Sequence, residues 1–265
     1  MTVNNVKVFV LSLPHAHERR KSVQRQFTEL GIDFEFFNGV YGNNLSESEI
    51  GLVYDSERAK IAVGRDLTKG EIGATYSHFK MYQKALNEGC EYLIIFEDDI
   101  IIDKRLKTFV DNLVTSTEVE DKSSIYFIQE HCNVENMISN DSRRTLAGFD
   151  FKRMFSSEEY FVGAYGYVLN NLAMKKLVQG YLKFYFVCDH WYFVRKIARI
   201  SRFYFLEQAL VFTNTDDVRE VDSFIQSERK KVIKTARLGI YQMIKLRIKK
   251  FLFSIFSIDR YEKDS

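Results

Sequence analysis

The stretch YLIIFEDDIII, residues 92–102, constrains the fold of this chain more than any other segment. An apolar, partly β-branched run of this length predicts a strand that is buried in a sheet. Glu97, Asp98 and Asp99 interrupt the run where the strand is expected to end. Unpaired carboxylates are costly to bury, so this triplet either points into solvent or faces something positively charged.

The rest of the pattern predicts an α/β domain whose mostly parallel central sheet is covered by helices. A strand at 7–13, a helix at 17–30 and a strand at 32–40 form a β-α-β beginning, and a loop is expected to lead into a helix within 68–89. Further strands are predicted at 124–129 and 160–170, a strand or hairpin at 202–213, and further helices at 45–59, 105–114 and 171–181. In open α/β sheets, ligands bind at the carboxyl ends of the strands, where the acidic triplet lies.

Composition and charge narrow the class of protein. The 265 residues are 46% hydrophobic and predict one globular domain over residues 1–225. Three separated cysteines without a C-x-x-C pair argue against a disulfide framework and against a zinc ribbon, and they favour a reducing, cytoplasmic compartment. No uncharged apolar run is long enough for a membrane span, and the first apolar run is too short for a signal peptide.

The last segment, residues 226–265, has a different character. Between Arg229 and Ile258 the chain carries nine Lys or Arg and no acidic residue. Ile240, Ile244 and Phe251 recur at helical spacing, which predicts a basic amphipathic helix that lies in a membrane interface and is drawn to anionic lipid. A helix that docks on the domain is the alternative. Nucleic-acid binding is not expected, because no known RNA-binding module accompanies the basic residues.

The acidic triplet suits a metal site. Strand residues at i and i+2 share a face, so Glu97 and Asp99 lie on one side if the strand geometry continues. Such hard oxygen ligands suit Mg²⁺ or Mn²⁺ beside substrate phosphates. Taken alone, the triplet also fits a metal-dependent phosphohydrolase, a nuclease or a solvated strand end.

Several spaced motifs give a more specific indication. They are Ser12-Leu13, Arg19-Arg20, the turn from Gly39 to Gly42 with Leu45, GEIG at 70–73, Ser77-His78, the EDD triplet, GAYGYVLNNLAMKKL from Gly163, and VCDHWYF from Val187. In this order they resemble glycosyltransferase family 25, from residue 6 to about residue 215. Two departures are Leu172, where the family has glycine, and the loosely matching FTNTDD at 212–217.

This resemblance implies a GT-A-like nucleotide-sugar-binding fold. It also implies inverting transfer of galactose, usually from UDP-galactose, to a saccharide acceptor such as a terminal sugar of lipooligosaccharide or lipopolysaccharide. Mn²⁺ or Mg²⁺ is expected on Asp99 and Glu97. The donor-binding residues implied are Ser12, Leu13, Arg19, Arg20, Gly70, Glu71, Gly73, Ser77, His78, Glu97 and Asp98.

For several of these residues a structural role stays open. His78 can instead make a core hydrogen bond, Glu71 can cap its helix, and one of the two arginines can be merely solvated. Gly70 and Gly73 are expected to let the backbone approach a ligand closely.

Asp189 is the candidate catalytic base, since it is one carboxylate among aromatic side chains. A metal ligand and a structural ion pair are its other possible roles. The acceptor side is assigned to Gly163, Ala164, Tyr165, His190 and Trp191. Trp191 can stack on a sugar ring or pack in the core. His190 can contact a ligand or be a hydrogen-bonded core residue.

Two other classes of function remain. A phosphohydrolase would use an early aspartate nucleophile, whereas Ser12 and Leu13 follow the first strand here. A non-catalytic lipid-surface binding protein would depend only on the basic tail. The identity of the acceptor and the oligomeric state are not determined by the sequence.

Overall fold

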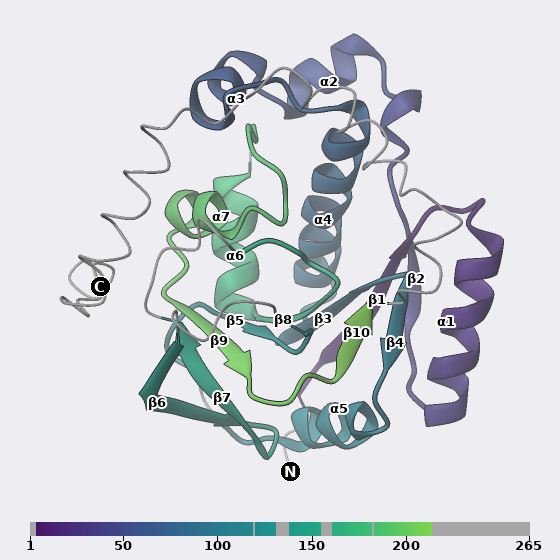
Figure 1. Ribbon diagram of the computed structural model, residues 1–265, viewed down its shortest axis with the longest axis vertical. Coiled ribbons are helices and arrows are strands. Elements are labelled where there is room, and N and C mark those ends of the chain that lie inside the picture. Colours follow the sequence, from purple (N-terminus) through teal and green to yellow (C-terminus); the bar gives the residue numbers. More distant parts are fainter. Residues whose placement is uncertain (1–3, 119, 131–137, 155–160, 182, 214–265) are drawn as a thin grey trace, which may run out of the picture.

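The computed structural model describes residues 4–118, 120–130, 138–154, 161–181 and 183–213. At its centre is an eight-stranded sheet with the strand order β2-β1-β3-β8-β5-β9-β7-β6 (Figure 1). Its strands are β1 (Val6–Ser12), β2 (Glu35–Asn38), β3 (Tyr92–Glu97), β5 (Ser124–Phe127), β6 (Ile138–Leu146), β7 (Phe149–Met154), β8 (Gly166–Asn170) and β9 (Arg202–Leu206). A separate two-stranded sheet pairs β4 (Ile100–Ile102) with β10 (Val211–Thr213).

The predicted α/β class with a mostly parallel sheet is confirmed. β2, β1 and β3 pair in parallel, as do β5 and β9. β8 runs antiparallel between β3 and β5, and β7 runs antiparallel between β9 and β6. The β6–β7 hairpin was not predicted. Its turn residues Ala147 and Gly148 have φ values of 55° and 79°. Two successive positive φ values match a type I′ turn, whose twist suits a tight hairpin.

Helices cover both faces of the sheet. The buried residues of α1 (His17–Leu30) and α5 (Arg105–Thr115) belong to one core cluster, and those of α4 (Lys69–Asn87), α6 (Asn171–Gly180) and α7 (Trp191–Ala198) to the other. The strand side chains alternate between the clusters. On β3, Ile94 and Phe96 face α1 and α5, whereas Ile95 faces α4. Glu97 is therefore directed to the α4 side by the two-residue period of the strand.

Two segments differ from the predicted elements. Residues 45–59 were expected to form a single short helix. They contain the whole of α2 (Glu47–Val53) and the start of α3 (Ser56–Val63). Ser46 caps α2 through a capping box with Glu49. The glycine-rich loop expected before α4 is instead the first turn of that helix, because Thr68 and Glu71 form a second capping box.

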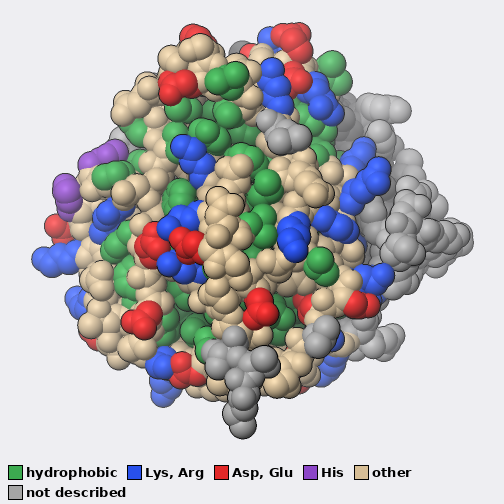
Figure 2. All heavy atoms as spheres, turned by 180° about the vertical axis from the view of Figure 1, so that it is seen from behind, with side chains coloured by type: hydrophobic (Ala, Val, Ile, Leu, Met, Phe, Trp, Pro, Cys, Tyr) green, Lys and Arg blue, Asp and Glu red, His purple; other side chains and the backbone are tan. Residues whose placement is uncertain are grey.

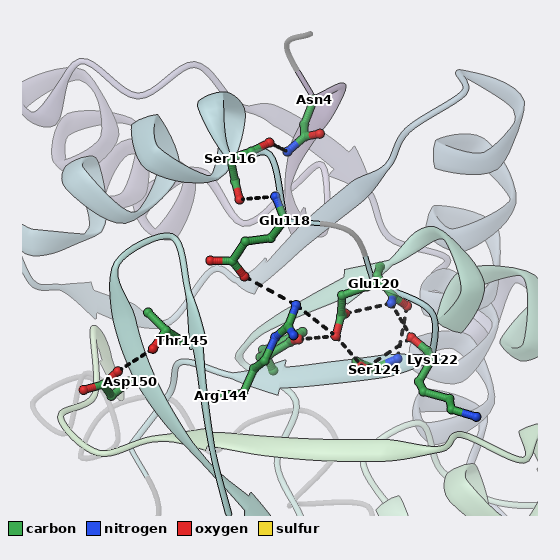
Figure 3. Close-up of polar contacts among 11 residues, drawn as sticks. Asn4, Ser116, Glu118, Glu120, Lys122, Ser124, Arg144, Thr145 and Asp150 are labelled. Atoms are coloured by element: carbon green, nitrogen blue, oxygen red, sulfur yellow. Dashed lines mark hydrogen bonds and ion pairs between the residues drawn. The ribbon is translucent and has the colours of Figure 1, made fainter. Parts of the chain in front are cut away.

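A polar network fixes the loop that leads into β5 (Figure 3). The buried Glu120 carboxylate accepts hydrogen bonds from Tyr126 Oη at 2.6 Å and from Asn170 Nδ2 at 2.8 Å. Arg144 of β6 forms ion pairs with both acidic residues of this loop. Its Nη2 lies 3.9 Å from Glu120 Oε1 and 3.4 Å from Glu118 Oε2. These contacts join β5, β8 and β6, so we assign the network a structural role.

The face shown in Figure 2 carries acidic and basic side chains close to one another, so its described part presents no broad basic field. In the described part of the chain, no helix combines the length and hydropathy needed to cross a bilayer. The predicted basic helix of residues 226–265 and the domain boundary at residue 225 lie outside the described residues.

Candidate functional site

The carboxyl ends of β1 and β3, the residues after β2 and the first turns of α4 enclose a cleft of about 600 Å³. The cleft therefore lies where an α/β sheet is expected to bind its ligand. The predicted donor-binding residues in its wall are Ser12, Leu13, Arg19, Gly70, Ser77, His78, Glu97 and Asp98. Arg20, Glu71 and Gly73, also predicted, are not part of its wall.

Negative charge concentrates around Glu97. Burial raises the pKa of Glu97 well above its ordinary value, and the charges of Asp99, Asp189 and Asp98 raise it further. The positive charge of Arg19 lowers this pKa but does not offset the other contributions. Asp189, which is far from the triplet in sequence, therefore lies near it in the fold. A proton or a bound cation must relieve the repulsion.

Asp98 has its own partners. It accepts hydrogen bonds from Ser12 Oγ at 2.6 Å and from Arg19 Nη1 at 3.2 Å, and its side chain is 11% exposed. Asp98 is therefore an anchored part of the cleft wall rather than a solvated neighbour. β3 ends at Glu97, so strand geometry does not extend to Asp99. The charge of Asp99 nevertheless raises the pKa of Glu97, so these two carboxylates lie close together beyond the end of the strand.

The two predicted arginines have different positions. Arg19 lines the cleft. Arg20 donates hydrogen bonds to Ser12 O at 3.0 Å and to Asn38 Oδ1 at 2.5 Å, and it lies over the ring of Phe36. Arg20 therefore ties the ends of β1 and β2 together, and neither arginine is merely solvated.

Gly73 of α4 and Gly42 of the turn beside it allow the helix and the turn to pack closely. A Cβ on Gly73 would lie 2.5 Å from Val40 O, and a Cβ on Gly42 would lie 1.7 Å from Lys69 O. Ser77 accepts a hydrogen bond from Val40 N at 2.8 Å and so holds the same turn against α4. Gly73 thus lets the helix approach the 39–42 turn, which corrects our expectation that it approaches a ligand. Gly70 does line the cleft.

Replacing Gly42 by Ala should lower the free energy of unfolding by about 3 kcal/mol or more, since the new methyl group meets backbone atoms that cannot rotate away. Gly51→Ala is the matched control. Gly51 lies within α2, where an added methyl group would meet nothing within 4 Å, so this change should stabilise by about 0.5–1 kcal/mol. Urea unfolding measures both. Equal stability of the two variants would contradict this packing.

Glu71 takes the structural alternative. Its carboxylate is fully buried and receives two hydrogen bonds of 2.7 Å from Arg65, and it also accepts from Thr68 N at 2.9 Å. These contacts close the capping box at the beginning of α4. Glu71 therefore shapes the cleft by fixing the helix that lines it.

The predicted acceptor residues divide between core and surface. Trp191 is fully buried among Phe127, Phe203 and Tyr167, and its Nε1 donates to Gly163 O at 2.9 Å. The expectation that Trp191 stacks on a sugar is thereby corrected, because no ring face is exposed. Ala164 is also buried. Gly163, Tyr165, Asp189 and His190 are partly exposed.

The cleft wall also contains residues that were not predicted to bind a ligand, among them His15 and Tyr41. The rings of His15 and Tyr41 meet edge to face with centroids 5.6 Å apart. His15 follows β1 and Tyr41 follows β2, so both lie just after the carboxyl ends of predicted strands. That position was the signal available in the sequence.

The donor atoms fit a metal in one particular way. Among the described residues, no three His, Cys, Asp or Glu side chains are arranged to hold an ion by themselves. Mg²⁺ and similar ions are commonly held by one or two carboxylates together with substrate phosphates. Glu97 and Asp99, two carboxylates at the end of β3, fit that mode, in which the ligand completes the coordination.

An α/β sheet with carboxylates at the end of a central strand, beside a cleft, fits the class of enzyme that the spaced sequence motifs indicated. Residues 5–192 match the model of "Glycosyltransferase family 25 (LPS biosynthesis protein)". The chain belongs to this family.

Relatives of known name agree with this membership. The chain is 26% identical over 196 residues to "Lipooligosaccharide biosynthesis protein lex-1" of Haemophilus influenzae, covering 67% of this chain and 64% of the relative. It is 32% identical over 117 residues to "Procollagen galactosyltransferase 1-A" of Xenopus laevis, covering 42% of this chain and 19% of the relative. The matches thus span less than two thirds of either relative.

Among solved structures, the chain is similar to a glycosyltransferase involved in glycosylation of the major capsid of PBCV-1. The match covers 87% of this chain and 99% of that one, with a TM-score of 0.38 and 10% identity. This likeness is too weak to inform the fold.

Proposed function

We propose that this protein is an inverting glycosyltransferase that transfers galactose from UDP-galactose to a terminal sugar of a lipooligosaccharide or lipopolysaccharide acceptor. The observation that carries the proposal is the group of carboxylates around Glu97, which lies in the wall of a cleft that Arg19 also lines. The printed names of the relatives, which include lipooligosaccharide biosynthesis and procollagen galactosyltransferase proteins, support the acceptor and the sugar.

The residues of the cleft suit three tasks. Arg19 would contact the diphosphate, since a guanidinium matches phosphate oxygens. Asp99 and Glu97 would hold Mn²⁺ or Mg²⁺, which when bound neutralises the charge of the leaving diphosphate. Asp189 would accept the proton of the acceptor hydroxyl, whose oxygen bonds to the anomeric carbon on the face opposite the departing UDP.

A donor-hydrolysis screen tests this function. UDP-, GDP- and CMP-sugars are incubated with the protein, with and without Mn²⁺, and release of the nucleotide is measured. Cation-dependent release from UDP-galactose above the other donors is expected. Hydrolysis of simple phosphate esters instead would indicate a phosphohydrolase. Absence of any thermal shift with nucleotide sugars would favour a non-catalytic lipid-surface binding protein.

We further propose that residues 226–265 bind the cytoplasmic face of the inner membrane. Each Lys or Arg near an anionic bilayer contributes about 1 kcal/mol, so even four of the nine basic residues would give measurable binding. The chain truncated after Glu228 should lose cosedimentation with anionic vesicles and its advantage on a lipid-linked acceptor. It should keep its turnover of a small soluble acceptor.

Salt should weaken vesicle binding by the full chain, because the attraction is partly electrostatic. If truncation instead inactivates the enzyme on the soluble acceptor, the segment docks on the catalytic domain. Vesicle binding that survives truncation would also contradict the proposal.

A further inference from the structure

Three buried polar side chains form a hydrogen-bonded chain behind the wall of the cleft. His78 and Tyr82 lie one turn apart on α4, and Tyr167 lies on β8 opposite Ile95 of β3. His78 Nδ1 is 2.6 Å from Tyr167 Oη, which is 2.8 Å from Tyr82 Oη. His78 is 1% exposed and still contributes to the cleft wall.

The available protons favour one direction for this chain. If Tyr82 donates to Tyr167 and Tyr167 donates to His78 Nδ1, each hydroxyl proton has an acceptor. In the reverse direction, Tyr82 would accept from Tyr167, and its own proton would have no acceptor among the described residues. Leaving a buried donor unsatisfied costs about 1–3 kcal/mol, so the first direction is preferred.

This direction determines the protonation of His78. Because Nδ1 accepts from Tyr167, the proton of the neutral ring resides on Nε2. Burial lowers the pKa of His78 to about 3, so the ring stays neutral at physiological pH despite the nearby carboxylates. A neutral ring of this kind offers an N–H donor in the wall of the cleft.

We infer that Tyr82 and Tyr167 hold His78 as its Nε2–H tautomer, so that His78 donates a hydrogen bond to an oxygen of the nucleotide sugar in the cleft. The ligand part of this inference rests on the proposed function. Tyr82 and Tyr167 are then positioning residues, which act on the ligand only through His78.

The test is Tyr167→Phe, which removes the hydroxyl and keeps the ring. Tyr181→Phe is the matched control, since the buried Tyr181 hydroxyl has no hydrogen-bond partner among the described residues. Long-range ¹H–¹⁵N spectra of the full chain, assigned with His78→Gln, report which ring nitrogen of His78 carries the proton.

The wild type and Tyr181→Phe should show only the Nε2–H tautomer, and Tyr167→Phe a mixture of both. Added UDP should shift the Nε2 resonance of the wild type. In turnover of UDP-galactose, Tyr167→Phe should lower kcat/KM by about 10-fold, the scale of one lost hydrogen bond. His78→Gln, whose amide nitrogen reaches the position of Nε2, should retain more turnover than His78→Asn.

An Nδ1–H tautomer in the wild type would overturn the inference, and so would an unchanged tautomer in Tyr167→Phe. If UDP binds and the Nε2 resonance does not shift, the proposed hydrogen bond from His78 to the ligand is overturned. The spectra of the ligand-free protein decide the tautomer whatever the donor screen shows. Failure of this inference and failure of the proposed function are therefore distinguishable.

Discussion

Replacing Asp99 by Asn is expected to reduce Mn²⁺-dependent turnover by about 100-fold or more while the protein stays folded. Asp99 is the charge that contributes most to the raised pKa of Glu97, which places its carboxylate close to the proposed cation. The amide keeps the shape and removes the charge that would face the diphosphate. Electrostatic stabilisation by a metal is worth several kcal/mol, and each 1.36 kcal/mol corresponds to a factor of ten.

The matched control is Asp111→Asn, an exposed aspartate of α5 that pairs with Lys107 and should be silent. Titration of Mn²⁺ in the presence of UDP measures the lost affinity, and thermal unfolding checks the fold. Because the cation must displace a proton from Glu97, Mn²⁺ affinity of the wild type should rise with pH through the raised pKa of Glu97. Full activity of Asp99→Asn would overturn the metal-site assignment.

Asp189→Asn is expected to lower kcat by about 100-fold or more with little change in donor affinity. General base catalysis contributes about 10²–10⁴-fold, and an amide cannot accept the proton of the acceptor hydroxyl. The charge of Asp189 raises the pKa of Glu97, so the two carboxylates lie near each other although they are far apart in sequence.

Separate measurements of donor binding and turnover distinguish the possible roles of Asp189. A base affects turnover alone. If the affinities for UDP-galactose and Mn²⁺ collapse together in Asp189→Asn, this residue is a metal ligand and the proposed role is wrong. A fall in melting temperature with unchanged turnover would instead indicate a structural ion pair.

Much of the fold was predictable because it depends on local signals. The apolar run before Glu97 became β3, a fully buried strand up to that residue. Ser46 became a helix cap because its hydroxyl and Glu49 satisfy each other's backbone donors within one turn. Residues 69–73 form the first turns of a helix rather than a loop. The capping box of Thr68 and Glu71 begins the helix there although the segment contains two glycines.

The acidic triplet and its place at a strand end were determined by the sequence alone, since a strand fixes the spacing of its own residues. Only the tertiary structure decided that Trp191 is buried, that Gly73 packs against Val40 and that Tyr167 reaches His78. Each of these facts joins residues far apart in the chain. Such contacts depend on which faces of the sheet and helices meet, and local propensity and spacing carry no information about that.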